Sequence, residues 1–113
     1  MVQAAIDLEH LARYTGGEKA INADILRLFD GQITRMVAEL HTVLENSDAK
    51  RWREVTHSIK GAARGVGAFA MGDLAARAEP VQPGDTTAAK DLIEKLESET
   101  QIVRAFIEAY LAA

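Results

Sequence analysis

His57 stands in a segment rich in basic and small residues, THSIKGAARGVGA at positions 56–68. Three cations, Arg53, Lys60 and Arg64, lie at positions −4, +3 and +7 from it. On a helix these spacings bring side chains together on one surface. A neutral imidazole nitrogen is a nucleophile, and neighbouring cations suit a reaction in which negative charge arrives at it. The segment therefore indicates a nucleophilic histidine in a positively charged environment.

The periodicity of the same segment predicts that His57 lies outside the core. At about 100° per residue from Trp52, His57 falls at about 140° and Gly61 at about 180°. Gly61 costs roughly 1 kcal/mol in a helix interior relative to alanine, so its presence needs a steric reason. We expect that it lets a large second molecule approach the imidazole. The opposite, buried face is predicted to consist of Trp52, Val55, Ile59, Ala63 and Val66.

Helical spacings recur along the whole chain of 113 residues, and alternating strand patterns do not. We therefore expect one all-α domain over residues 1–113, an antiparallel four-helix bundle with a short additional N-terminal helix. Asp7, Asp48 and Asp85 are the expected N-caps. The predicted helices cover residues 8–14, 18–45, 49–66, 69–79 and 86–113. The apolar stripe predicted for the second of them is Ile21, Ile25, Leu28, Phe29, Ile33, Met36, Val37, Leu40, Val43 and Leu44.

Composition and charge exclude several functional classes. The net charge of −4 argues against a nucleic-acid binder, although five of the 13 basic residues lie between Lys50 and Arg64, with one of the 17 acidic ones. Cysteine is absent, which excludes disulfides and thiolate metal sites and suits a reducing cytoplasm. We find no signal peptide and no apolar run of the roughly 18 residues that a membrane span requires. We expect a cytoplasmic protein without membrane or nucleic-acid partners.

The segment HSIKGAARGVGA resembles the signature of histidine phosphotransfer (HPt) domains, which is H-x-x-K-G followed by small residues and G-A. Two further regions are similar to the family: residues 6–29, and Leu74, Ala75 and Glu79 in the fourth predicted helix. The resemblance therefore covers nearly the whole chain. One departure is that Ala62 and Ala63 stand where many relatives have serine. The signature positions are His57, Lys60, Gly61, Ala62, Ala63, Gly67 and Ala68.

The resemblance implies a phosphorelay carrier without kinase activity of its own. His57 would accept a phosphoryl group from an aspartyl phosphate on the receiver domain of a hybrid histidine kinase, and pass it to the receiver of a response regulator. Lys60 would contact the phosphoryl oxygens, and Gly61, Arg64 and Arg53 would meet the partner. No metal site or cofactor is expected in this chain, because Mg²⁺ belongs to the receiver. We expect a monomer.

Two alternatives remain at this point. One is an interaction or scaffold bundle that has the fold and never carries phosphate. The other is an enzyme in which His57 is a general base beside Ser58. The sequence disfavours the enzyme because adjacent side chains on a helix diverge by about 100°, and we find no third group that would orient the imidazole.

Overall fold

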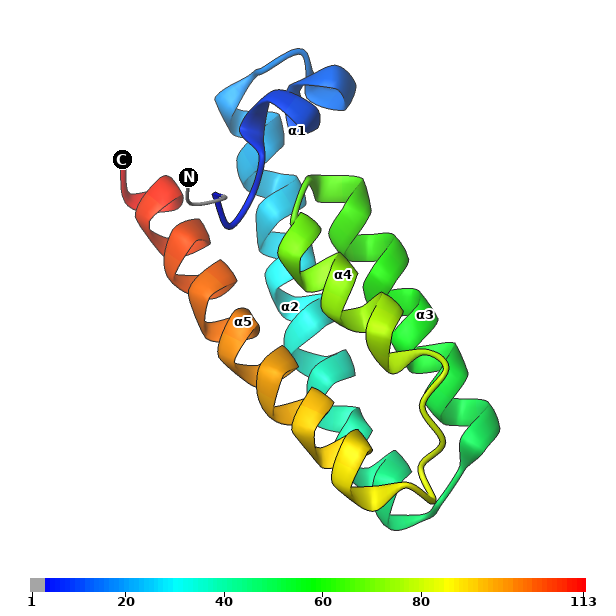
Figure 1. The fold of residues 1–113 in the computed structure, drawn as a ribbon. Coiled ribbons are helices and arrows are strands. Elements are labelled where there is room, and N and C mark those ends of the chain that lie inside the picture. The colour runs from blue at the N-terminus through cyan, green and yellow to red at the C-terminus, as the bar shows by residue number, and fades with distance from the viewer. Residues whose placement is uncertain (1–3) are drawn as a thin grey trace.

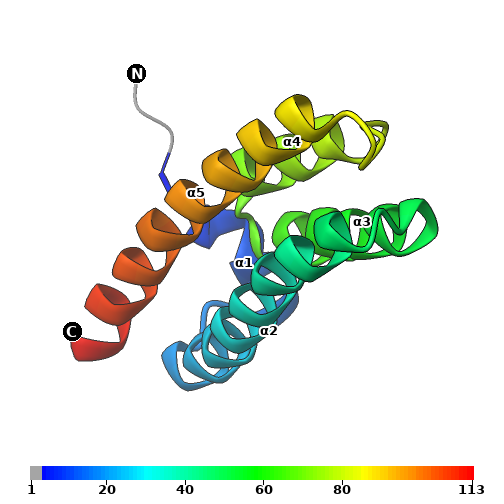
Figure 2. The same ribbon diagram turned by 90° about the horizontal axis from the view of Figure 1, so that it is seen from below.

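The computed structural model describes residues 4–113, and within that range every regular element is a helix. Helices α2 to α5 run antiparallel and form a four-helix bundle, while the short α1 lies across one end of it (Figures 1 and 2). The predicted all-α fold with a short additional helix is confirmed. The helices are α1 (Leu8–Thr15), α2 (Lys19–Glu45), α3 (Ala49–Val66), α4 (Phe69–Ala78) and α5 (Thr86–Ala112).

The three predicted aspartate caps are present. The Asp7 carboxylate accepts hydrogen bonds from two backbone N–H groups of the first turn of α1, and Asp48 and Asp85 each accept one, at the starts of α3 and α5. Gly67 ends α3 with φ of 88°, a left-handed conformation that favours glycine. A Cβ there would lie 2.7 Å from the carbonyl oxygen of Asp7. The Asp7 N–H in turn donates to the Gly67 carbonyl at 2.9 Å, so the start of α1 is fastened to the α3–α4 corner.

Each bundle helix packs against two neighbours, so that α3 contacts α2 and α4, and α5 contacts the same two helices from the opposite side. The core between them is apolar and includes Trp52 and Ile59 of α3 at 0% exposure. The α2 stripe was predicted incorrectly at two positions, since Ile21 and Leu28 are 41% and 62% exposed. Leu28 lies about 140° around the helix from the buried Ile33, which places it outside the core-facing arc.

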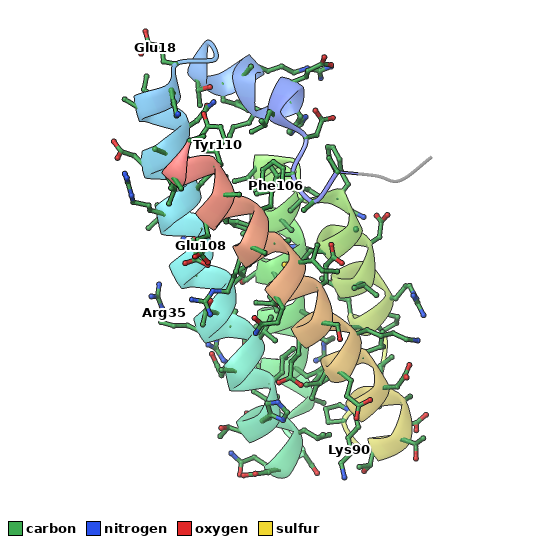
Figure 3. The ribbon with its side chains drawn as sticks, turned by 90° about the vertical axis from the view of Figure 1, so that its left-hand side faces the viewer. Glu18, Arg35, Lys90, Phe106, Glu108 and Tyr110 are labelled. Carbon is green, nitrogen blue, oxygen red and sulfur yellow. The ribbon has the colours of Figure 1, made fainter. Side chains whose placement is uncertain are left out.

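A polar network ties α1 to the rest of the bundle. The Thr15 hydroxyl donates to Asn22 Oδ1 at 2.6 Å, and Asn22 Nδ2 donates to the Tyr110 hydroxyl at 3.1 Å. Figure 3, which looks onto α2 and α5, shows Tyr110 at the end of the bundle that α1 covers. Because buried polar atoms need partners, this network fixes α1 on α2 and joins that end of α2 to α5.

Candidate functional site

His57 lies on the outer face of α3, and 68% of its side chain is exposed. Trp52, on the same helix, is fully buried. The opposite placement of these two side chains confirms the prediction from periodicity. Gly61 is also exposed, and a Cβ built there would meet nothing within 4 Å. The surface one turn beyond the imidazole is therefore open.

A carboxylate that the sequence analysis did not assign to the site lies beside the imidazole. Glu79 follows the last residue of α4, and its Oε1 is 3.3 Å from His57 Nδ1. Its Oε2 accepts a hydrogen bond from Lys60 Nζ at 2.6 Å. One carboxylate thus joins the histidine and the lysine, which are three residues apart on α3. We had predicted purely basic surroundings for His57, and the position of Glu79 shows that this prediction was wrong.

The ionisation of Glu79 determines which nitrogen of His57 carries the proton. The hydrogen bond from Lys60 is the largest of the influences that lower the pKa of Glu79, and His57 adds to it. An ionised carboxylate only accepts hydrogen bonds, so His57 Nδ1 must be the donor. In the neutral imidazole this leaves the lone pair on Nε2. The geometry therefore favours the nucleophilic form at Nε2.

Lys60 is the more enclosed member of the pair, with 23% of its side chain exposed against 30% for Glu79. An ammonium group has three N–H donors, and Glu79 takes one of them in this structure. The others remain available to oxygen atoms that arrive next to His57. Lys60 can accordingly hold Glu79 and contact an incoming anion together.

The two arginines predicted for the site are placed differently. The Arg64 side chain lies against α4, where a Cβ at Gly72 would be 2.9 Å from Arg64 Cγ, and its Nη2 is 3.9 Å from an Asp73 oxygen. It is half exposed. Arg53 is exposed and makes no ion pair within residues 4–113. The structure thus groups His57, Lys60 and Glu79 tightly, with Arg53 and Arg64 on either side along α3.

Glu79 was missed as a site residue because it is 22 residues away from His57 in the sequence. The family resemblance included Glu79, but no local pattern gave it a role. Only the packing of α4 on α3 brings it to the imidazole. Our statement that no third group orients the imidazole was wrong, since Glu79 does so.

Other features of the described chain lie apart from His57 or are absent. Across residues 4–113, no group of three His, Asp or Glu side chains is placed to hold a metal ion. Three surface hollows lie in the groove between α2 and α5, on the side of the bundle away from His57, and a fourth is lined by α5 alone. No helix in this range is long and apolar enough to cross a membrane.

We predict that Lys60→Met raises the pKa of Glu79 toward the ordinary glutamate value of about 4.3, because the largest influence lowering it is removed. The carboxylate would then protonate at a higher pH. The contacts of Glu79 stabilise the fold above its unfolded-state pKa and are lost as the pH falls through the folded-state value, so this loss should also start at a higher pH in the variant. A carbon-13 NMR titration of the Glu79 side chain measures the shift.

Lys50→Met is the matched control for this titration. Lys50 is an exposed cation on α3 that makes no ion pair in the described part of the chain. It should leave the Glu79 titration unchanged. Equal shifts in the two variants would mean that general charge, and not the Lys60 hydrogen bond, lowers the pKa of Glu79.

Comparison with known proteins agrees with this geometry. The family model for the Hpt domain matches residues 24–110. The crystal structure of histidine-containing phosphotransfer protein B (HptB) from Pseudomonas aeruginosa PAO1 superposes with a TM-score of 0.85 at 26% sequence identity, covering 96% of this chain and 95% of that one. No curated protein sequence matched the chain. The two matches support a histidine phosphotransfer role in phosphorelays. Since the family model spans most of the sequence, including the helix that carries His57, the chain belongs to the Hpt domain family.

Proposed function

We propose that the protein carries a phosphoryl group on His57 between two receiver domains. It takes the group from the aspartyl phosphate of a hybrid histidine kinase receiver and gives it to an aspartate of a response-regulator receiver. The observation that carries this proposal is the exposed imidazole whose Nδ1 is bound to Glu79, which leaves the lone pair on Nε2. A nucleophile of this kind is what attack on an acyl phosphate requires.

In the proposed step, the Nε2 lone pair attacks the phosphorus of the aspartyl phosphate. A nitrogen–phosphorus bond forms, the phosphorus–oxygen bond to the aspartate breaks, and the aspartate leaves as a carboxylate. Nδ1 keeps its proton throughout. The ring gains positive charge as the bond forms, and the Glu79 carboxylate at 3.3 Å stabilises that charge. Transfer to the second receiver is the same step in reverse.

Lys60 is the proposed contact for the phosphoryl oxygens. The transition state of phosphoryl transfer is loose and spreads negative charge over its equatorial oxygens. The Lys60 ammonium group is held next to His57 by their common partner Glu79. Its free N–H donors can bind those oxygens without a large rearrangement, so the stabilising charge is in place before the reaction begins.

The proposed docking surface for the receiver is the outer face of α3 around Gly61. The open space at Gly61 supports a close approach, and Arg53 and Arg64 offer positive charge to an acidic receiver surface. The proposed docking surface continues onto α2, where it is apolar. Leu28 is 62% exposed and shares a face of α2 with Glu39, which binds Arg51 of α3. We propose that the receiver covers this edge of α2 as well.

The remaining parts of the proposal concern what the chain leaves to its partners. Mg²⁺ and the acidic pocket that binds it would belong to the receiver, and ATP-dependent phosphorylation to the kinase, so we propose a carrier with no cofactor and no kinase activity. We further propose a monomeric, cytoplasmic protein, since a freely diffusing carrier can meet two receivers in turn. An enzyme with Ser58 as nucleophile is disfavoured because neighbouring helix side chains diverge by about 100°.

A transfer assay tests the proposal against the scaffold alternative. A receiver domain is phosphorylated with labelled acetyl phosphate and Mg²⁺, freed of excess donor and mixed with the protein. We expect the label to move to the protein as an acid-labile, alkali-stable phosphate, and then to move on when a second receiver is added. Binding of receivers without any transfer of label would support the scaffold and contradict the carrier.

A further inference from the structure

We propose that Trp52 is a positioning residue for the phosphoryl-accepting centre, acting from inside the core. Its indole N–H holds the end of α4 where the Glu79 carboxylate can reach His57. The consequence for transfer rates rests on the proposed function, whereas the effect on the imidazole itself does not.

The contact that carries this inference is a buried hydrogen bond between α3 and α4. Trp52 is 0% exposed, and its Nε1 donates to the carbonyl oxygen of Ala78 at 2.8 Å. Ala78 is the last residue of α4, and Glu79 is its C-cap. The tryptophan therefore binds the backbone directly before the residue that contacts the imidazole.

Apart from the burial of Ala78 and the hydrogen bond from the Glu79 N–H to the Ala75 carbonyl at 3.0 Å, little fixes the end of α4 locally. Helix α4 has only 10 residues, and the last carbonyl groups of a helix lack partners within it. The Ala78 carbonyl has two: the Trp52 indole, and the Val81 N–H at 3.0 Å in the following turn. A carboxylate at a helix C-terminus is also disfavoured by the helix dipole. Tertiary contacts must therefore keep Glu79 in place.

Helix α3 contacts this end of α4 at two places, one in the core and one at the surface. Trp52 binds it from the core, and His57 and Lys60 bind Glu79 at the surface. Glu79 must meet two partners at once, at 3.3 Å and 2.6 Å, and a hydrogen bond weakens steeply when its geometry is disturbed. If the backbone at Ala78 is no longer held by Trp52, Glu79 is no longer kept within hydrogen-bond distance of both His57 and Lys60. The Nδ1–H form of His57 is then no longer enforced.

Two replacements remove the N–H donor. Trp52→Phe keeps an aromatic ring but reduces its size, whereas β-benzothienylalanine at position 52 keeps the shape of the indole and replaces N–H with sulfur. Long-range proton–nitrogen NMR of His57 reports which ring nitrogen is protonated. We expect both replacements to raise the fraction of the Nε2–H form, and phosphorylation by phosphoramidate to become about ten times slower.

Two controls separate positioning from loss of stability. Val103→Ala removes a fully buried side chain from α5 and should leave the His57 tautomer and the rate unchanged in the folded protein. In a Glu79→Ala background, Trp52→Phe should have no further effect on either, because the group that it positions is gone.

The proposal is overturned if the benzothienyl protein keeps the original tautomer and rate. It is equally overturned if Val103→Ala shifts them as far, or if the effect of Trp52→Phe persists without Glu79. A tautomer shift in a protein that takes up no phosphate from any donor would support the positioning role and contradict the carrier function. The two ideas can thus fail separately.

Discussion

We expect His57→Gln to take up no phosphoryl group from either a phosphorylated receiver or a small donor, and to fold as the original protein does. Glutamine has no nucleophilic ring nitrogen, so the acceptor is lost. The side chain is 68% exposed and faces away from the core, so the free energy of unfolding should change by no more than about 0.5 kcal/mol. Radiolabel uptake and thermal unfolding followed by circular dichroism measure the two effects.

His41→Gln is the matched control for this variant. His41 is also exposed, and it also contacts a glutamate, Glu97, but through Nε2 at 3.2 Å. Its Nε2 is therefore engaged where that of His57 is available. We expect this variant to accept phosphate at the original rate. Persistent labelling of His57→Gln would place the acceptor elsewhere, and a large loss of stability would contradict the surface position of His57.

We expect Gly61→Gln to slow transfer from a phosphorylated receiver by orders of magnitude and to leave the rate with phosphoramidate nearly unchanged. The position is exposed and helical with open space around it, so the fold should tolerate the larger side chain. That side chain lies one turn from the imidazole, where it would hold the aspartyl phosphate beyond the roughly 3 to 3.5 Å needed for attack. Phosphoryl transfer from each donor is stopped at successive times, and the amount of phosphorylated protein at each time gives the two rates.

The ratio of these rates separates steric exclusion from damage to His57. Ala109→Gln places the same side chain on an exposed position of α5, away from α3, and should affect neither rate. Gly61→Ala should raise stability by up to about 1 kcal/mol and slow the receiver reaction much less than glutamine does. Equal losses with both donors in Gly61→Gln would mean that Gly61 does not serve the approach of a partner.

The sequence predicted those features that depend on residues close together along one helix. The opposite placement of Trp52 and His57 follows from five residues of helical periodicity, and the caps at Asp7, Asp48 and Asp85 are likewise local. The apolar stripe of α2 was less accurate. Counting every apolar residue as buried included Ile21 and Leu28, although their angular positions lie outside the arc that faces the core.

Contacts between helices could not be predicted in the same way. Whether Glu79 reaches His57 depends on the register of α4 against α3, which is set by core packing and by the bond from Trp52 to Ala78. A glutamate followed by proline gives only the signal of a helix end. The orienting carboxylate therefore became visible only when the two helices were placed together.

The most direct test of the account is to identify the atom that carries the phosphate. The protein, uniformly labelled with nitrogen-15, is phosphorylated by a receiver domain, and long-range proton–nitrogen and phosphorus NMR spectra are recorded at a pH where phosphohistidine is stable. The account predicts one phosphorus–nitrogen coupling, to Nε2 of His57, with Nδ1 still protonated and bound to Glu79. Phosphate on Nδ1, on another residue, or on no residue of this chain would contradict it.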